Sequence, residues 1–180
     1  EQTGQLLEQY YIPYHKSIES DLRDDSLICA FDCHTMLDIA PPCAPREVCH
    51  RPFICLSNLG DEQGDGDEQE LSCPPELIHT LADCLRQQFP EEADRILLNT
   101  PFKGGHITQV HSHSIPWIQI ELNRNAYLSK PWFDPTTLSV NPQRIWDLRL
   151  RFFKAFTEFC YKLESSRHPN YSYLPRSVMS

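Results

Sequence analysis

An aspartate and a histidine lie two residues apart, directly after a short apolar run. Leu27 to Phe31 is apolar, and Asp32 and His34 follow it. Such a run is typical of a buried strand, and in open α/β sheets the ligand crevice lies at the carboxyl ends of the strands. The spacing puts both side chains on the same side of an extended chain, where an imidazole beside a carboxylate can act as a metal ligand or general base. A structural role, in which the two side chains satisfy nearby backbone groups, stays open.

A third candidate, Glu121, lies within an alternating segment. Trp117 to Leu122 has apolar residues at every second position, while Gln119 and Glu121 point the other way. A carboxylate in the middle of such a strand is costly to bury without a partner. Glu121 is therefore expected to bind a metal, pair with a cation or act in catalysis. The alternatives are a salt bridge to Arg124 or a sheet edge in water.

A glycine pair follows another predicted strand end. Gly104 and Gly105 let the backbone approach a neighbour closely or adopt a positive φ, and Lys103 beside them offers a cation for an anionic group. An ordinary turn is the alternative. Further on, His111 and His113 share one face if the chain is extended, which fits a metal pair. An exposed loop edge is the preferred interpretation of these two histidines.

The composition indicates one folded globular domain. The chain has 180 residues, of which 40% are hydrophobic and 11% aromatic. The formal net charge of −9 argues against a general nucleic-acid binder, which needs a basic surface. The absence of an apolar run of membrane-spanning length argues against a membrane partner.

Cysteine usage favours a reduced, cytoplasmic chain. Of the eight cysteines, Cys29, Cys55, Cys84 and Cys160 lie in apolar-patterned segments, where a free thiol behaves as a small hydrophobe. A structural zinc site is an alternative for the remaining cluster, although it lacks a CxxC pair. That cluster consists of Cys43, Cys49, His50 and Cys73.

Helical and strand patterns alternate along the chain, which predicts an α/β fold. Strands are expected at 27–31, 53–56, 95–99 and 117–122. Helices are expected over 1–22, over 72–89 with Ser72 as its cap, and from Pro142 with Asn141 as its cap. The expected organisation is a domain over residues 1–164 and a polar tail over 165–180.

Three blocks occur in an order that resembles the N-formylglutamate amidohydrolase family. They are Asp32–Met36, Asn99–Thr108 and Gln119–Leu128, and Tyr11–His15 is similar to that family's Pro-Tyr-His element. The resemblance covers roughly residues 5–160. It implies a phosphorylase/hydrolase-like α/β fold with a mixed central sheet flanked by helices, distantly similar to the zinc carboxypeptidases.

The resemblance also implies an activity and a role for each candidate residue. Such enzymes use a zinc-activated water to remove an acyl group, here formyl, from an N-acylated acidic amino acid such as N-formylglutamate. His34 matches a zinc ligand, and Glu121 matches the general base. Arg124 and Lys103 would hold the carboxylates of this dianionic small molecule.

One part of the family pattern has no counterpart in this sequence. The family begins with a strand that carries a Pro-His-type motif and an early carboxylate, and no such segment precedes Glu1. One expectation is therefore the carboxyl-terminal part of a larger domain, without its N-terminal strands. The other is a catalytically inactive binding or interaction protein with a hydrolase fold. The sequence does not predict the oligomeric state.

Overall fold

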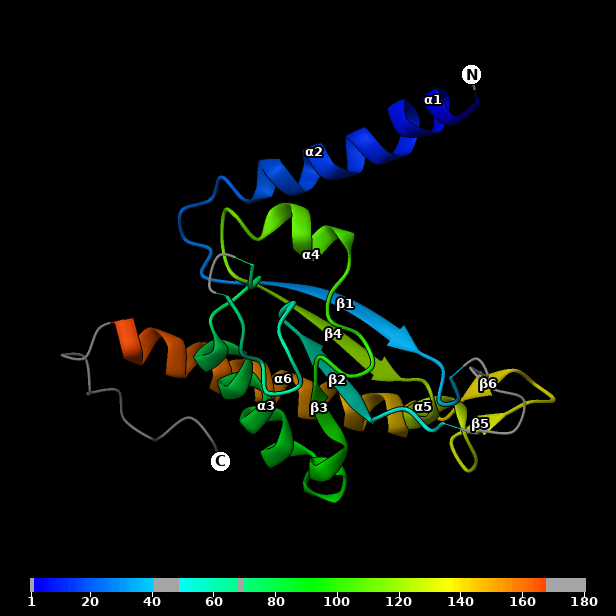
Figure 1. The fold of residues 1–180 in the computed structure, drawn as a ribbon. Coiled ribbons are helices and arrows are strands. Elements are labelled where there is room, and N and C mark those ends of the chain that lie inside the picture. The colour runs from blue at the N-terminus through cyan, green and yellow to red at the C-terminus, as the bar shows by residue number, and fades with distance from the viewer. Residues whose placement is uncertain (1, 41–48, 68–69, 168–180) are drawn as a thin grey trace.

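The computed structural model describes residues 2–40, 49–67 and 70–167, and it has a central mixed sheet with helices on both faces (Figure 1). This arrangement confirms the α/β fold class expected from the sequence. In chain order the elements are α1 (Gln2–Leu6), the π-helix η1 (Leu7–Tyr11), α2 (Ile12–Asp21), β1 (Ala30–Met36), β2 (Ile54–Ser57), α3 (Pro75–Gln88), the 3-10 helix η2 (Pro90–Arg95), β3 (Ile96–Leu98), α4 (His106–His111), β4 (Trp117–Asn123), α5 (Asn125–Leu128), β5 (Phe133–Asp134), β6 (Ser139–Val140) and α6 (Pro142–Arg167).

The main sheet has the strand order β1-β4-β2-β3, and β5 and β6 form a separate two-stranded sheet. β1 and β4 run parallel, β2 runs antiparallel to β4, and β2 and β3 run parallel. Two distant segments, residues 30–36 and 117–123, therefore lie side by side over seven paired positions.

The apolar core lies between one face of this sheet and the helices α3 and α6, while α4 lies over the other face (Figure 1). Phe89 and Phe159 are fully buried side chains of this core. α6 begins as the sequence predicts, because Asn141 Oδ1 accepts hydrogen bonds from the backbone amides of Gln143 and Arg144. A capping side chain of this kind satisfies amides that have no partner inside the helix.

Two predicted element boundaries are wrong. β1 spans Ala30–Met36, so Asp32 and His34 lie inside the strand and not beyond its carboxyl end. The reason is the parallel partner, since β4 continues the pairing as far as Met36 and Asn123. Ser72 does not cap α3, because its hydroxyl donates to the backbone oxygen of Trp117 at 2.8 Å and the helix begins at Pro75.

The amino-terminal helical segment has large apolar side chains in contact with solvent. Leu6, Tyr10 and Tyr14 are each more than half exposed, and this segment extends over α4 on the outside of the molecule (Figure 1). Among the α2 side chains, His15 is buried. The sequence therefore predicts this helix correctly, although its exposed apolar side chains do not join the core.

The carboxyl-terminal tail and the cysteines that the sequence singles out lie partly within the described residues. α6 continues to Arg167, beyond residue 164, and residues 168–180 of the predicted tail lie outside the described residues. Seven cysteines fall in the described ranges and are free thiols, and Cys43 lies outside them. Within those ranges no helix combines the length and apolarity needed to cross a membrane. The cytoplasmic location stays a prediction.

The core on α6 gives a direct test of this packing. Phe159 is fully buried, whereas Phe153 on the same helix is 67% exposed. We expect Phe159→Ala to lower the free energy of unfolding by about 3–5 kcal/mol, because it removes a buried ring and leaves a cavity. Phe153→Ala is the matched control and should cost less than about 1 kcal/mol. Equilibrium urea unfolding measures both, and equal losses would contradict the described packing.

Candidate active site

Four polar side chains lie on one face of the adjacent strands β1 and β4. Asp32 is paired in register with Gln119, and His34 is paired with Glu121. Because side chains alternate along a strand, these four point away from the core, which Ile120 and its apolar neighbours enter from the other face. The structure thus brings together the two residues for which the sequence predicts chemistry, His34 and Glu121.

Asp32 orients the His34 imidazole. His34 Nε2 donates to Asp32 Oδ1 at 2.7 Å, and Asp32 Oδ2 accepts a longer, 3.5 Å bond from Thr108 of α4. Asp32 is buried, whereas the His34 side chain is 45% exposed. With Nε2 as the donor to Asp32, Nδ1 is the ring nitrogen left to accept a hydrogen bond or bind a metal. The carboxylate therefore fixes both the orientation and the tautomer of this imidazole.

Glu121 is a buried carboxyl group with an amide neighbour. Gln119 Nε2 donates to Glu121 Oε1 at 3.3 Å. Burial raises the pKa of Glu121 above its ordinary value, and nearby Asp32 adds to the rise, while His34 and the Gln119 hydrogen bond act in the opposite direction. The expected alternative of a salt bridge to Arg124 does not form, since Arg124 Nε donates to Thr35 Oγ1 at 3.0 Å.

The two expected carboxylate-binding cations line separate hollows. Arg124 lines a groove of about 550 Å³ whose other lining residues include Ile120, Leu122 and Phe156, so it opens on the side of the sheet that faces α6. Lys103 lines another hollow, of about 460 Å³, together with Leu59 and Gly104. The structure therefore places the Arg124 side chain on the opposite face of the sheet from the Glu121 carboxyl group, and it places Lys103 at the glycine pair. Both substrate-binding roles stay predictions.

The glycine pair has the close backbone approach that the sequence predicts. Gly104 has a φ of +138°, and a Cβ there would lie 2.5 Å from Leu59 Cδ2. A Cβ on Gly105 would lie 3.0 Å from Gln119 Oε1 and 3.9 Å from Asp32 Oδ2. The segment therefore runs against the polar face of the sheet without a side chain in between.

The structure separates the two histidines before β4, which the sequence places together at an exposed loop edge. His111 is buried, and its Nε2 lies 2.7 Å from His15 Nδ1 of α2. Burial and the neighbouring His15 lower the pKa of His111. His113 is exposed, so the loop-edge interpretation holds for His113 and is wrong for His111. The sequence gives no signal for a pair 96 residues apart.

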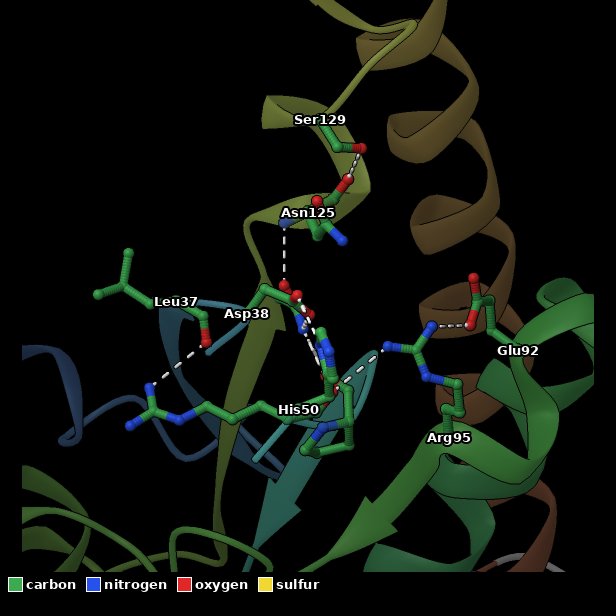
Figure 2. Close-up of polar contacts among 10 residues, drawn as sticks. Leu37, Asp38, His50, Glu92, Arg95, Asn125 and Ser129 are labelled. Atoms are coloured by element: carbon green, nitrogen blue, oxygen red, sulfur yellow. Dashed lines mark hydrogen bonds and ion pairs between the residues drawn. The ribbon is translucent and has the colours of Figure 1, made fainter. Parts of the chain in front are cut away.

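The sequence also gives no signal for the contacts that hold the ends of the site strands. At the end of β4, buried Asn123 Nδ2 donates to Asp38 Oδ1 and to the Pro52 backbone oxygen, both at 3.0 Å. Figure 2 shows Asp38 facing the His50 ring, and the two are 2.9 Å apart. Cys55 of β2 is paired in register with Glu121, and burial raises the pKa of the Cys55 thiol.

The described residues do not fit a complete metal site. Across residues 2–40, 49–67 and 70–167, no group of three or more His, Cys, Asp or Glu side chains is placed to hold a metal ion. A catalytic zinc ion takes three protein ligands. His34 beside Asp32 falls short of that set, and Cys43 of the alternative cysteine cluster lies outside the described residues.

The fold and the site define an α/β protein with a carboxyl group and an oriented imidazole on one face of a mixed sheet, two groups that act in general acid–base catalysis. The sequence model of the N-formylglutamate amidohydrolase family matches residues 1–128. This chain belongs to the N-formylglutamate amidohydrolase family.

A solved structure with a similar fold is the N-formylglutamate amidohydrolase from Ralstonia eutropha JMP134. The TM-score is 0.57 at 17% sequence identity, and the match covers 91% of this chain and 55% of that chain. This chain thus spans about half the length of that protein. No curated protein sequence matches this chain.

The raised pKa of Glu121 predicts a pH-dependent stability difference. Since the folded chain holds this proton more tightly than the unfolded chain, stability falls as the pH rises above about 4.3, the unfolded value. Glu121→Gln cannot ionise, so its free energy of unfolding relative to the wild type should increase between about pH 4 and pH 7. Urea unfolding across this range measures the difference.

The control for this pH series is Glu62→Gln, which removes an exposed carboxylate from the loop after β2. It accounts for the general effect of losing one negative charge. A Glu121→Gln difference that stays constant with pH would contradict the burial of this carboxyl group.

Proposed function

We propose that this chain takes part in hydrolysis of the amide bond of an N-acylated acidic amino acid such as N-formylglutamate. The observation that carries the proposal is the register pairing of His34 with Glu121, whose buried carboxyl group has a raised pKa. Family membership over residues 1–128 supports the reaction class. The name of the Ralstonia protein supports the same substrate class.

Glu121 is the proposed general base. A carboxyl group with a raised pKa holds a proton more readily near neutral pH, which is what a base that must later act as an acid requires. It accepts a proton from the attacking water as the water oxygen bonds to the formyl carbon. It then passes this proton to the nitrogen as the carbon–nitrogen bond breaks, which yields formate and the free amino acid.

His34 and the cations have supporting roles in this proposal. Asp32 binds Nε2 of the half-exposed His34 ring, which leaves Nδ1 as the acceptor nitrogen of that ring. Arg124 offers a planar fork that matches a carboxylate, although its Nε donates to Thr35 on the face of β1 opposite Glu121. Lys103 offers a point charge beside the glycine pair.

Zinc stays a prediction of the family resemblance. Zinc bound at such a site would lower the pKa of a water molecule and polarise the acyl oxygen. His34 is the candidate ligand, but the described donors around it are too few, so no step above depends on the ion.

The zinc prediction is tested by equilibrium dialysis of the full chain against zinc. We expect His34→Ala to take up less zinc than the wild type, because the substitution removes the candidate imidazole ligand. His79→Ala is the control, since His79 is an exposed histidine on α3. Equal uptake by wild type and His34→Ala would contradict a role for His34 in zinc binding.

The proposed base is tested by formate release from N-formylglutamate. Glu121→Gln keeps the shape of the side chain but cannot accept the proton, so we expect the rate to fall by about 100-fold or more. Glu62→Gln, on the exposed loop, should retain the wild-type rate. Unchanged formate release in Glu121→Gln would sink the assignment.

One observation favours a second candidate function, a binding protein that retains the hydrolase fold without catalysis. The described side chains bring no three-ligand metal group to His34. A wild-type chain that binds N-formylglutamate in calorimetry but releases no formate would favour this function over hydrolysis.

A further inference from the structure

The side-chain amide of Gln119 makes a hydrogen bond through its nitrogen, and its oxygen has no donor in the described part of the chain. Its Nε2 donates to Glu121 Oε1 at 3.3 Å, and the side chain is almost completely buried. Its Oε1 is also buried, and no group in the described part of the chain donates a hydrogen bond to it. A buried acceptor without a donor destabilises a fold, so such an atom calls for a ligand or a functional reason.

The unpartnered oxygen lies within the candidate site and not in the apolar core. A Cβ built on Gly105 would come within 3.0 Å of Gln119 Oε1 and within 3.9 Å of Asp32 Oδ2. Because Gly105 has no side chain, its backbone lies close to both oxygens, and a side chain there would press on Gln119 Oε1. Asp32 is also the residue that orients His34, so the oxygen borders the imidazole–carboxylate pair.

We propose that Gln119 Oε1 accepts a hydrogen bond from the N–H of the substrate's scissile amide, an inference that rests on the proposed function. The other end of the same side chain holds Glu121, the group that must protonate the leaving nitrogen. One glutamine therefore fixes the distance between the proton donor and the atom that receives the proton. Gln119 is a substrate-contacting residue that selects amides.

The chemical consequence is discrimination between an amide and the matching ester. An ester has an oxygen where the amide has N–H, so it cannot donate to Gln119 Oε1. A site built around a substrate N–H disfavours an analogue without it, because its own polar group is then left unpaired. The preference for the amide should therefore depend on Gln119 more than the overall rate does.

The test compares N-formyl-L-glutamate with the formate ester of 2-hydroxyglutarate as substrates of the full chain. In Gln119→Met we expect the ratio of kcat/KM for the amide to that for the ester to fall about tenfold. Loss of the Glu121 contact also lowers the amide rate more than the ester rate, because the leaving nitrogen depends more on protonation than an ester oxygen does. The ratio of the two binding affinities involves no proton transfer, so it isolates the N–H contact. Gln87→Met, on the exposed side of α3, is the control and should leave the ratio unchanged.

Binding of the same two compounds separates this inference from the proposed function. If the wild type binds the amide without cleaving it, the proposed hydrolysis fails, and calorimetry decides the inference. Gln119→Met must then weaken amide binding about tenfold more than ester binding. An unchanged amide-to-ester ratio in Gln119→Met, in rates or in affinities, overturns the inference. A wild type that binds neither compound contradicts both.

Discussion

The parallel register of β1 on β4 is the constraint on which the candidate site depends. It sets His34 opposite Glu121 and Asp32 opposite Gln119. A slip of one residue would turn every side chain of one strand to the other face. Backbone bonds hold both ends of the pairing, from Ala30 to the Pro116 oxygen and from Arg124 to the Met36 oxygen, each at 2.9 Å.

The two faces of this sheet have opposite chemistry, and the difference explains the unusual properties of the site. The face against α3 and α6 is packed with apolar side chains and accounts for the core. The other face buries Asp32, Gln119 and Glu121 beneath α4 and the glycine pair. Buried polar groups cost stability when they are incompletely paired, so their persistence at one place is typical of a functional site. The raised pKa of Glu121 is the electrostatic expression of this burial.

Local sequence patterns were sufficient for part of the fold and for the central pair of residues. The alternation around Glu121 predicts β4 and its polar face, and Asn141 with Pro142 predicts the start of α6. The residue type of His34 and its spacing from Asp32 indicate a site there, although β1 extends past it. The extension could not be predicted, because it depends on the length of a partner strand far along the chain.

Contacts between distant segments account for the rest of what the sequence did not predict. The His15–His111 pair and the Asn123–Asp38 bond join residues 96 and 85 positions apart, and no periodicity connects such positions. From sequence alone, Gln119 is only a residue on the polar side of an alternating strand. Its unpartnered oxygen becomes visible once the register and the glycine pair are known.

The central claim is that the polar face formed by β1 and β4 is the ligand-binding site. Titration of the ¹⁵N-labelled chain with N-formylglutamate, followed by two-dimensional NMR, tests it most directly. We predict saturable shifts at the backbone amides of His34 and Glu121 and at the side-chain amide of Gln119. Shifts confined to the hollow between Ser112 and the start of α3, with none on β1 or β4, would contradict the account.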